Sequence, residues 1–159
     1  MKLIQELLFG KKKIIMQNKF KKCLEYKKIV RFNRGPNLVS KELKLSLDDL
    51  DSAKDIYKRG NYKWAIVHAY YSMFHAGRGL LYIKRYREKS HYCLIEAIRE
   101  LYVKEKELSF VFIENIYKAK MLIEEADYYG EYKKSMAEKL IKKSEEFLNE
   151  VKKIIENKK

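Results

Sequence analysis

Two histidines in the middle of the sequence have the spacing that most favours shared chemistry. His68 and His75 are seven residues apart, which places both side chains on one face of a helix, two turns apart. Ser72 lies on the same face, whereas the apolar residues of this segment lie roughly opposite. Because an imidazole exchanges protons near neutral pH, we expect this histidine face (His68, Ser72 and His75) to line a groove or a subunit interface.

A metal site is one alternative for these histidines. Transition-metal sites generally need three or four protein ligands, and the stretch from Trp64 to Gly77 contains no Asp or Glu. We therefore expect no metal ligands and no cofactor. A structural role is a second alternative, in which the other ring nitrogen of His75 is hydrogen-bonded to a hydroxyl such as that of Ser72 or Tyr71.

The elements that position these side chains are expected to be helices. The segment 34–37, Arg-Gly-Pro-Asn, is the strongest break in the chain, since proline lacks a donor and disfavours helix in the residue before it. It separates a basic N-terminal extension, residues 1–37, from a helical domain, residues 38–159. Periodicity and caps predict helices over about 40–59, 62–84, 91–105 and 110–128, and a last helix that follows Gly130 and ends near Asn157.

These helices predict an all-α fold, an up-and-down antiparallel bundle of four to five helices with the basic extension at its N-terminus. The helix over 62–84 is nearly free of charge, so we expect it to be the most buried. Its end should bring His91 near Ile83 and Arg85. The expected helix caps are Ser40, Asn61, Ser90 and Ser109. The expected apolar stripe of the first helix is Leu43, Leu47, Leu50, Ala53 and Tyr57.

The charge of the chain is uneven. The formal net charge is +14, and residues 1–35 alone carry 11 Lys and Arg against two Glu. Lys and Arg release condensed counterions from phosphate backbones, so the extension is suited to RNA, DNA or anionic lipid. The alternative is a solvated tail without a partner.

The two cysteines, Cys23 and Cys93, are 70 residues apart with no CxxC motif. This pattern excludes a disulfide scaffold and favours free, reduced thiols, as in a cytoplasmic protein. We also expect no secretion signal and no membrane-spanning segment, because the stretch of lowest charge, 64–83, contains histidines, an arginine and glycines.

Several of these residues resemble the HEPN domain (higher eukaryotes and prokaryotes nucleotide-binding), in its branch of small stand-alone prokaryotic proteins. The resemblance covers about residues 38–156 and rests on Gly60-Asn61-Tyr62, Ala69-Tyr70-Tyr71-Ser72-Met73-Phe74-His75-Ala76, Lys89-Ser90-His91 and Ala126-Asp127-Tyr128. It implies a bundle of four or five helices, often dimeric, that associates with nucleotides or RNA. It also implies a small nucleotidyltransferase partner in a toxin–antitoxin pair and, in active members, a metal-independent ribonuclease.

Active members use an Arg and a His with four to six residues between them, and Arg85 and His91 fit that spacing. His75, His91 and Arg85 are thus the catalytic candidates. The sequence departs from this pattern at His68 and Ile123, where relatives commonly have arginine. The pair Arg85–His91 spans a turn, and the alternative interpretation of this turn is a solvent-exposed connection between two helices without catalytic function. The candidates for nucleotide or RNA binding are His68, Tyr71, Ser72, Arg78, Arg85, Arg87 and Lys89.

Two classes of function therefore stay open. One is a protein that binds nucleotide or RNA, with or without ribonuclease activity. The other is a non-catalytic helical module for dimerisation or for docking a nucleotidyltransferase. The departures from the catalytic pattern favour the second class, whereas the basic extension and the basic turn favour the first.

Overall fold

A computed structural model describes residues 1–158, and within them it gives no side-chain placement for residues 12–18. The elements in chain order are α1 (Lys2–Glu25), β1 (Ile29–Arg31), α2 (Gly35–Lys58), α3 (Tyr62–Ile83), β2 (Tyr86–Glu88), α4 (His91–Ile98), a π-helical turn η1 (Arg99–Val103), α5 (Phe110–Tyr129) and α6 (Lys134–Glu156). The predicted all-α fold is confirmed.

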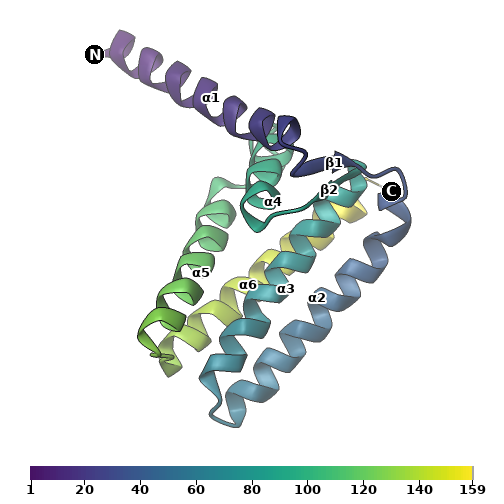
Figure 1. Cartoon of the computed structure of the whole chain (residues 1–159), viewed down its shortest axis with the longest axis vertical. Helices are drawn as coiled ribbons and strands as arrows, with labels where there is room; N and C mark the ends of the chain where they lie inside the picture. Colours follow the sequence, from purple (N-terminus) through teal and green to yellow (C-terminus); the bar gives the residue numbers. More distant parts are fainter. Residues whose placement is uncertain (159) are drawn as a thin grey trace.

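The long helices α2, α3 and α6 pack along one another (Figure 1). Helix α5 lies on the side of α3 opposite to α2 and contacts α3 and α6 (Figure 1). The short α4 covers the upper part of α3. Helix α1 rests its C-terminal part on α4 and projects beyond the bundle with its N-terminal part (Figure 1). Among α2–α6, α3 has the most buried residues, which confirms that the helix with the least charge forms the centre of the core.

Most helix ends follow from local chemistry. The side chains of Asn61, Ser90 and Ser109 accept hydrogen bonds from the first turns of α3, α4 and α5, as expected for N-caps. Ser40 was expected to cap the first helix, and this is wrong, because α2 begins at Gly35 with Pro36 in its first turn. Proline is tolerated there, since a first-turn residue has no N–H partner within the helix.

The predicted apolar stripe of α2 is also partly wrong. Leu47 is 40% exposed, whereas Glu42 and Ser46 are buried. The polar side chains face α3, where hydrogen-bonding partners compensate for their burial. Polar residues on α3 therefore decide which face of α2 is turned inward.

The N-terminal extension is joined to the bundle by a two-stranded antiparallel sheet. Strand β1 pairs with β2 in the register Ile29↔Glu88, Val30↔Arg87 and Arg31↔Tyr86. Ile29 is buried, and the ring of Phe20 packs edge-on against that of Tyr86. The basic turn before α4 was expected to be a solvated turn, but part of it is this strand. Three-residue strands distant in sequence leave no hairpin signal to predict.

The prediction of free thiols is wrong. Cys23 at the end of α1 and Cys93 in α4 form a disulfide, with Cα atoms 5.8 Å apart. The 70-residue separation of the cysteines suggested that they were unpaired, but the strand pairing overrides it. Strand β1 lies shortly after α1, and β2 lies shortly before α4. Pairing of the strands therefore brings the two helices, and their cysteines, together.

Candidate functional site

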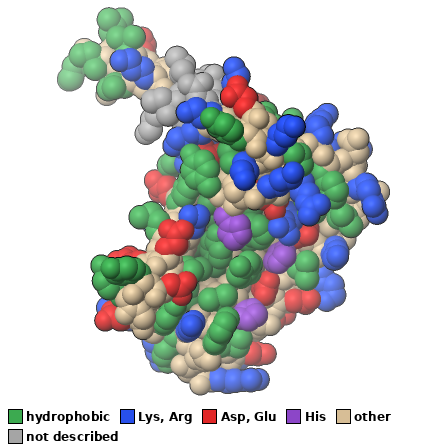
Figure 2. Space-filling view, viewed as in Figure 1, with side chains coloured by type: hydrophobic (Ala, Val, Ile, Leu, Met, Phe, Trp, Pro, Cys, Tyr) green, Lys and Arg blue, Asp and Glu red, His purple; other side chains and the backbone are tan. Residues whose placement is uncertain are grey.

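The histidine face packs against a matching row of polar residues on α2. Glu42, Ser46 and Asp49 are spaced four and three residues apart, as are His68, Ser72 and His75 on the antiparallel α3. Residues at this spacing share one helix face, so the two rows meet along the helix contact. Figure 2 shows the three histidines of the chain spread along one face of the molecule.

Each member of the histidine face has a partner on α2. His75 Nδ1 is 2.7 Å from Glu42 Oε2, and its Nε2 is 3.7 Å from Asp49 Oδ2. His68 Nδ1 is 2.9 Å from Asp49 Oδ1. The expected hydroxyl partner of His75 is therefore wrong, because a carboxylate from the neighbouring helix takes that position.

Ser72 lies at the centre of this contact and is fully buried. The hydroxyl of Ser46 donates to the backbone oxygen of Ser72 at 2.7 Å, and the two hydroxyl oxygens are 3.1 Å apart. The side chain proposed from the sequence to bind nucleotide is thus part of the α2–α3 packing and is closed to solvent.

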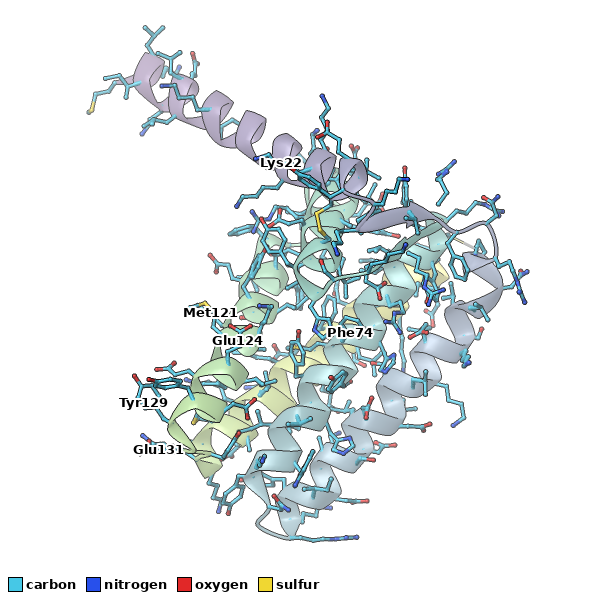
Figure 3. All side chains as sticks on the ribbon, in the orientation of Figure 1. Lys22, Phe74, Met121, Glu124, Tyr129 and Glu131 are labelled. Carbon is cyan, nitrogen blue, oxygen red and sulfur yellow. A yellow bond between two sulfur atoms is a disulfide. The ribbon has the colours of Figure 1, made fainter. Side chains whose placement is uncertain are left out.

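The ring of Phe74 is the centre of a second cluster, which contains the residues best placed for chemistry (Figure 3). The ring of His91 packs on it with centroids 4.3 Å apart, and the guanidinium carbon of Arg78 lies 4.5 Å from its centroid. Arg78 and His91 therefore both contact the ring of Phe74. His75 borders the same ring at 5.9 Å.

The position of His91 differs from the expectation. It was expected near Ile83 and Arg85, at the end of α3, but it lies beside the middle of α3, with its Nδ1 2.8 Å from the hydroxyl of Tyr70. The reason is β2, which extends the chain between α3 and α4 and carries it back along α3 before α4 begins. His91 and His75 are therefore closer than a tight turn would allow.

The surroundings of His91 lower its pKa. Burial of the ring is the largest cause, while Glu88 raises the pKa and the positive charges of Lys120 and Arg78 lower it further. A lowered pKa keeps the imidazole neutral and able to accept a proton at neutral pH. Burial also raises the pKa of Tyr70 to about 12, so this partner stays a neutral phenol.

Arg78 is held by a buried carboxylate. Its Nε and Nη2 donate to Glu88 Oε1 at 2.9 and 2.6 Å, and its Nη1 is 3.8 Å from Glu42 Oε1. The other oxygen of Glu88 is buried and has no hydrogen-bond partner in the described part of the chain. Stacking on Phe74 and the two bonds to one oxygen fix the guanidinium against the ring that His91 also contacts.

The structure does not bring together the pair selected by sequence spacing. The Arg85 guanidinium donates to the backbone oxygen of Asn33 at 2.7 Å, and Arg85 has a positive φ of 61°. The guanidinium of Arg87 lies over the ring of Phe32, and the Lys89 N–H donates to the backbone oxygen of Lys28. All three residues are exposed along β1 and β2, where Lys and Arg side chains gather in Figure 2.

An open groove of about 280 Å³ runs between α3 and α5 and reaches His91. Its α3 side is made by Val67, Tyr70 and Tyr71, of which Tyr71 is 41% exposed. Its α5 side is made by Lys120, Ile123, Glu124 and Asp127. Tyr71 is the one candidate from the list of binding residues that lines this groove.

Sequence reasoning missed the carboxylates of the site. Glu42 and Asp49 were overlooked because the leucines of α2 suggested another buried face, and Glu88 because it was assigned to a basic turn. A signal was available, because partly buried histidines at 68 and 75 need hydrogen-bond partners. Helix α2 offers polar residues at the same spacing. In the part of the chain that the structure describes, no group of three or more His, Cys, Asp or Glu is arranged to hold a metal ion.

Comparison with known proteins identifies the family of this chain. The model of the HEPN domain matches residues 40–154. A Methanocaldococcus jannaschii protein named "Putative toxin MJ0142" is 32% identical over 108 residues, covering 67% of this chain and 74% of the relative. A second protein of that organism, "Putative toxin MJ0605", is 27% identical over 114 residues, covering 71% of this chain and 85% of the relative.

A shorter match is to "UPF0332 protein PH1297" of Pyrococcus horikoshii, 38% identical over 56 residues, which cover 35% of this chain and 39% of the relative. The described helices include none with the length and apolar character needed to span a membrane. The family model covers most of the chain, including α3 and both Arg78 and His91. The chain belongs to the HEPN domain family.

Proposed function

We propose that this protein is a toxin that binds and cleaves RNA, with His91 and Arg78 as the reacting pair. The observation that carries the proposal is the contact of both side chains with the ring of Phe74, together with the open groove that His91 lines. A neutral imidazole and a fixed guanidinium on the same phenyl ring can supply proton transfer and charge stabilisation. The printed names of two relatives as toxins support this class of function.

The reaction follows from the two side chains. When the Nδ1 proton of His91 is donated to the Tyr70 oxygen, the Nε2 lone pair is left to take the proton of a ribose 2′-hydroxyl. The 2′-oxygen then bonds to phosphorus, the bond from phosphorus to the 5′-oxygen breaks, and the 5′-oxygen takes a proton from solvent. Arg78 Nη1, which is not bonded to Glu88, donates to the phosphate oxygens as their charge increases.

The proposal is tested with purified protein and a mixed-sequence RNA in the presence of EDTA, by detection of fragments that end in a 2′,3′-cyclic phosphate. Arg78→Lys should lower the cleavage rate at least about tenfold, because a point charge replaces the two-nitrogen fork, whereas Arg85→Lys should leave it unchanged. Thermal melting checks that both variants are folded. Cleavage that depends on Arg85 and not on Arg78 would return the assignment to the pair chosen by spacing, and absence of cleavage at every pH would reject the proposal.

RNA binding by the basic extension is the second part of the proposal. Deletion of residues 1–35 would be a poor test, because Cys23 and Ile29 belong to the core. Lys19, Lys22 and Lys28 line an open pocket beside the start of α4, and their joint replacement by Gln should weaken RNA binding. For single-stranded RNA the slope of log affinity against log salt should decrease by about 2.

The control for this variant is Lys134, Lys139 and Lys142 replaced by Gln, three exposed lysines of α6 with the same change in charge. Filter binding at several salt concentrations gives both slopes. Equal slopes for the two triple variants would show that the pocket beside α4 is not where RNA lies.

Partners complete the proposal. We infer a toxin–antitoxin pair, a small nucleotidyltransferase as the second component, and a homodimer of this chain. The outer face of α5 supports contact with another protein, because five large apolar side chains are exposed there. They are Phe110, Val111, Met121, Tyr128 and Tyr129. If RNA is neither bound nor cleaved, this face favours the alternative function, a non-catalytic interaction module.

A further inference from the structure

The groove between α3 and α5 has the composition of a site for one nucleobase. Tyr71 presents an exposed aromatic ring at its edge, and Ile123 supplies apolar surface from the opposite helix. Bases splayed out of single-stranded RNA stack on aromatic side chains of this kind. The volume of about 280 Å³ is just below the usual range of ligand pockets, which suits a single base.

Two charged side chains of α5, Lys120 and Glu124, line the groove together with His91 and Tyr70. Lys120 is close enough to His91 to lower its pKa, and Glu124, one turn further along α5, is close enough to Tyr70 to raise its pKa. The Lys120–Glu124 contact of 2.6 Å is a surface pair with Glu124 62% exposed, and such pairs are weak. Lys120 and Glu124 both line the groove, so a positive group and a carboxylate are available beside His91 and the two tyrosines.

A carboxylate distinguishes the four RNA bases by their Watson–Crick edges. Ionised Glu124 only accepts hydrogen bonds, through two oxygens. Guanine offers two adjacent donors, N1–H and N2–H, that match both oxygens. Adenine and cytosine place a ring-nitrogen acceptor next to their amino group, and uracil has one N–H between two carbonyls, so each brings a lone pair against the carboxylate.

We propose that this groove binds the guanine of the nucleotide on the 5′ side of the cleaved phosphate, with Tyr71 stacking on the base and Glu124 accepting its two N–H groups. Lys120 then faces the phosphate next to His91. The placement of the phosphate rests on the proposed function, whereas the base preference is a property of the groove itself.

The test uses the four ribonucleoside 3′-monophosphates and calorimetric titration of the full chain. Guanosine 3′-monophosphate should bind at least about tenfold more tightly than the other three, the discrimination expected of one good two-bond contact to a base. Glu124→Gln should reduce its affinity to that of adenosine 3′-monophosphate. Glu125→Gln, an exposed neighbour that does not line the groove, is the matched control and should leave the preference intact.

Equal affinity for the four nucleotides, or a guanine preference that survives Glu124→Gln, would overturn this inference. The outcome is distinguishable from that of the proposed function. A guanine preference without RNA cleavage keeps the groove assignment and rejects the ribonuclease, whereas cleavage at all four bases with equal frequency keeps the ribonuclease and rejects the groove assignment.

Discussion

His91→Ala is expected to lower the rate of RNA cleavage by about 10²–10⁴-fold, the usual contribution of a general base. His91 is the one histidine whose ring lines the groove between α3 and α5, and its pKa is lowered by burial. His68→Ala is the matched control, because His68 is paired with Asp49 on α2 and does not line that groove. Initial rates on a labelled RNA measure both variants.

The pH dependence of the same rate gives an independent check. A base must be unprotonated to act, so the rate should be constant near neutral pH and fall as the pH decreases through the pKa of His91. Because that pKa lies below the ordinary value of about 6.5, the midpoint of the fall should lie below pH 6.5. Cleavage by His91→Ala at the rate of the unmodified protein would exclude His91 as the base.

Reduction of the disulfide is expected to lower the free energy of unfolding by about 2–4 kcal/mol. The bond between Cys23 and Cys93 closes a loop with a sequence separation of 70, and a crosslink of this length restricts the unfolded chain strongly. Chemical denaturation with and without a thiol reductant measures the difference. A variant with both cysteines replaced by serine should unfold at the reduced midpoint and should not respond to the reductant.

An equal midpoint in oxidised and reduced protein would contradict this expectation. It would mean that the packing of β1 and Ile29 alone fixes the extension on α4. Free-thiol titration before and after reduction confirms that the bond has been opened, so the two measurements together separate an absent bond from a bond without energetic effect.

The helices were predictable because their signals are local. Caps at Asn61, Ser90 and Ser109 and glycines with positive φ at 60 and 130 are written within a few residues of each helix end. The burial of α3 was predictable from its lack of charge. These features need no knowledge of which elements are neighbours.

The candidate site is formed by contacts between segments that are distant in sequence, and these contacts could not be predicted from the sequence. Arg78 approaches His91 only because β2 shifts the start of α4 along α3, and β2 exists only because β1 pairs with it. The same pairing brings Cys23 to Cys93. One short sheet without a local signal therefore accounts both for the contact of Arg78 and His91 with one ring and for the wrong prediction of free thiols.

The crosslink between α1 and α4 also changes what a protease can do to this protein. Residues 23–93 form a closed covalent ring that contains α2, α3 and the side chains of His75, Arg78 and His91. A single broken peptide bond inside the ring leaves one connected molecule, whereas a break in α5 or α6 releases a fragment. In an oxidised chain, one nick near Arg78 and His91 therefore leaves the chain covalently connected, whereas one nick in the helix that carries Glu124 does not.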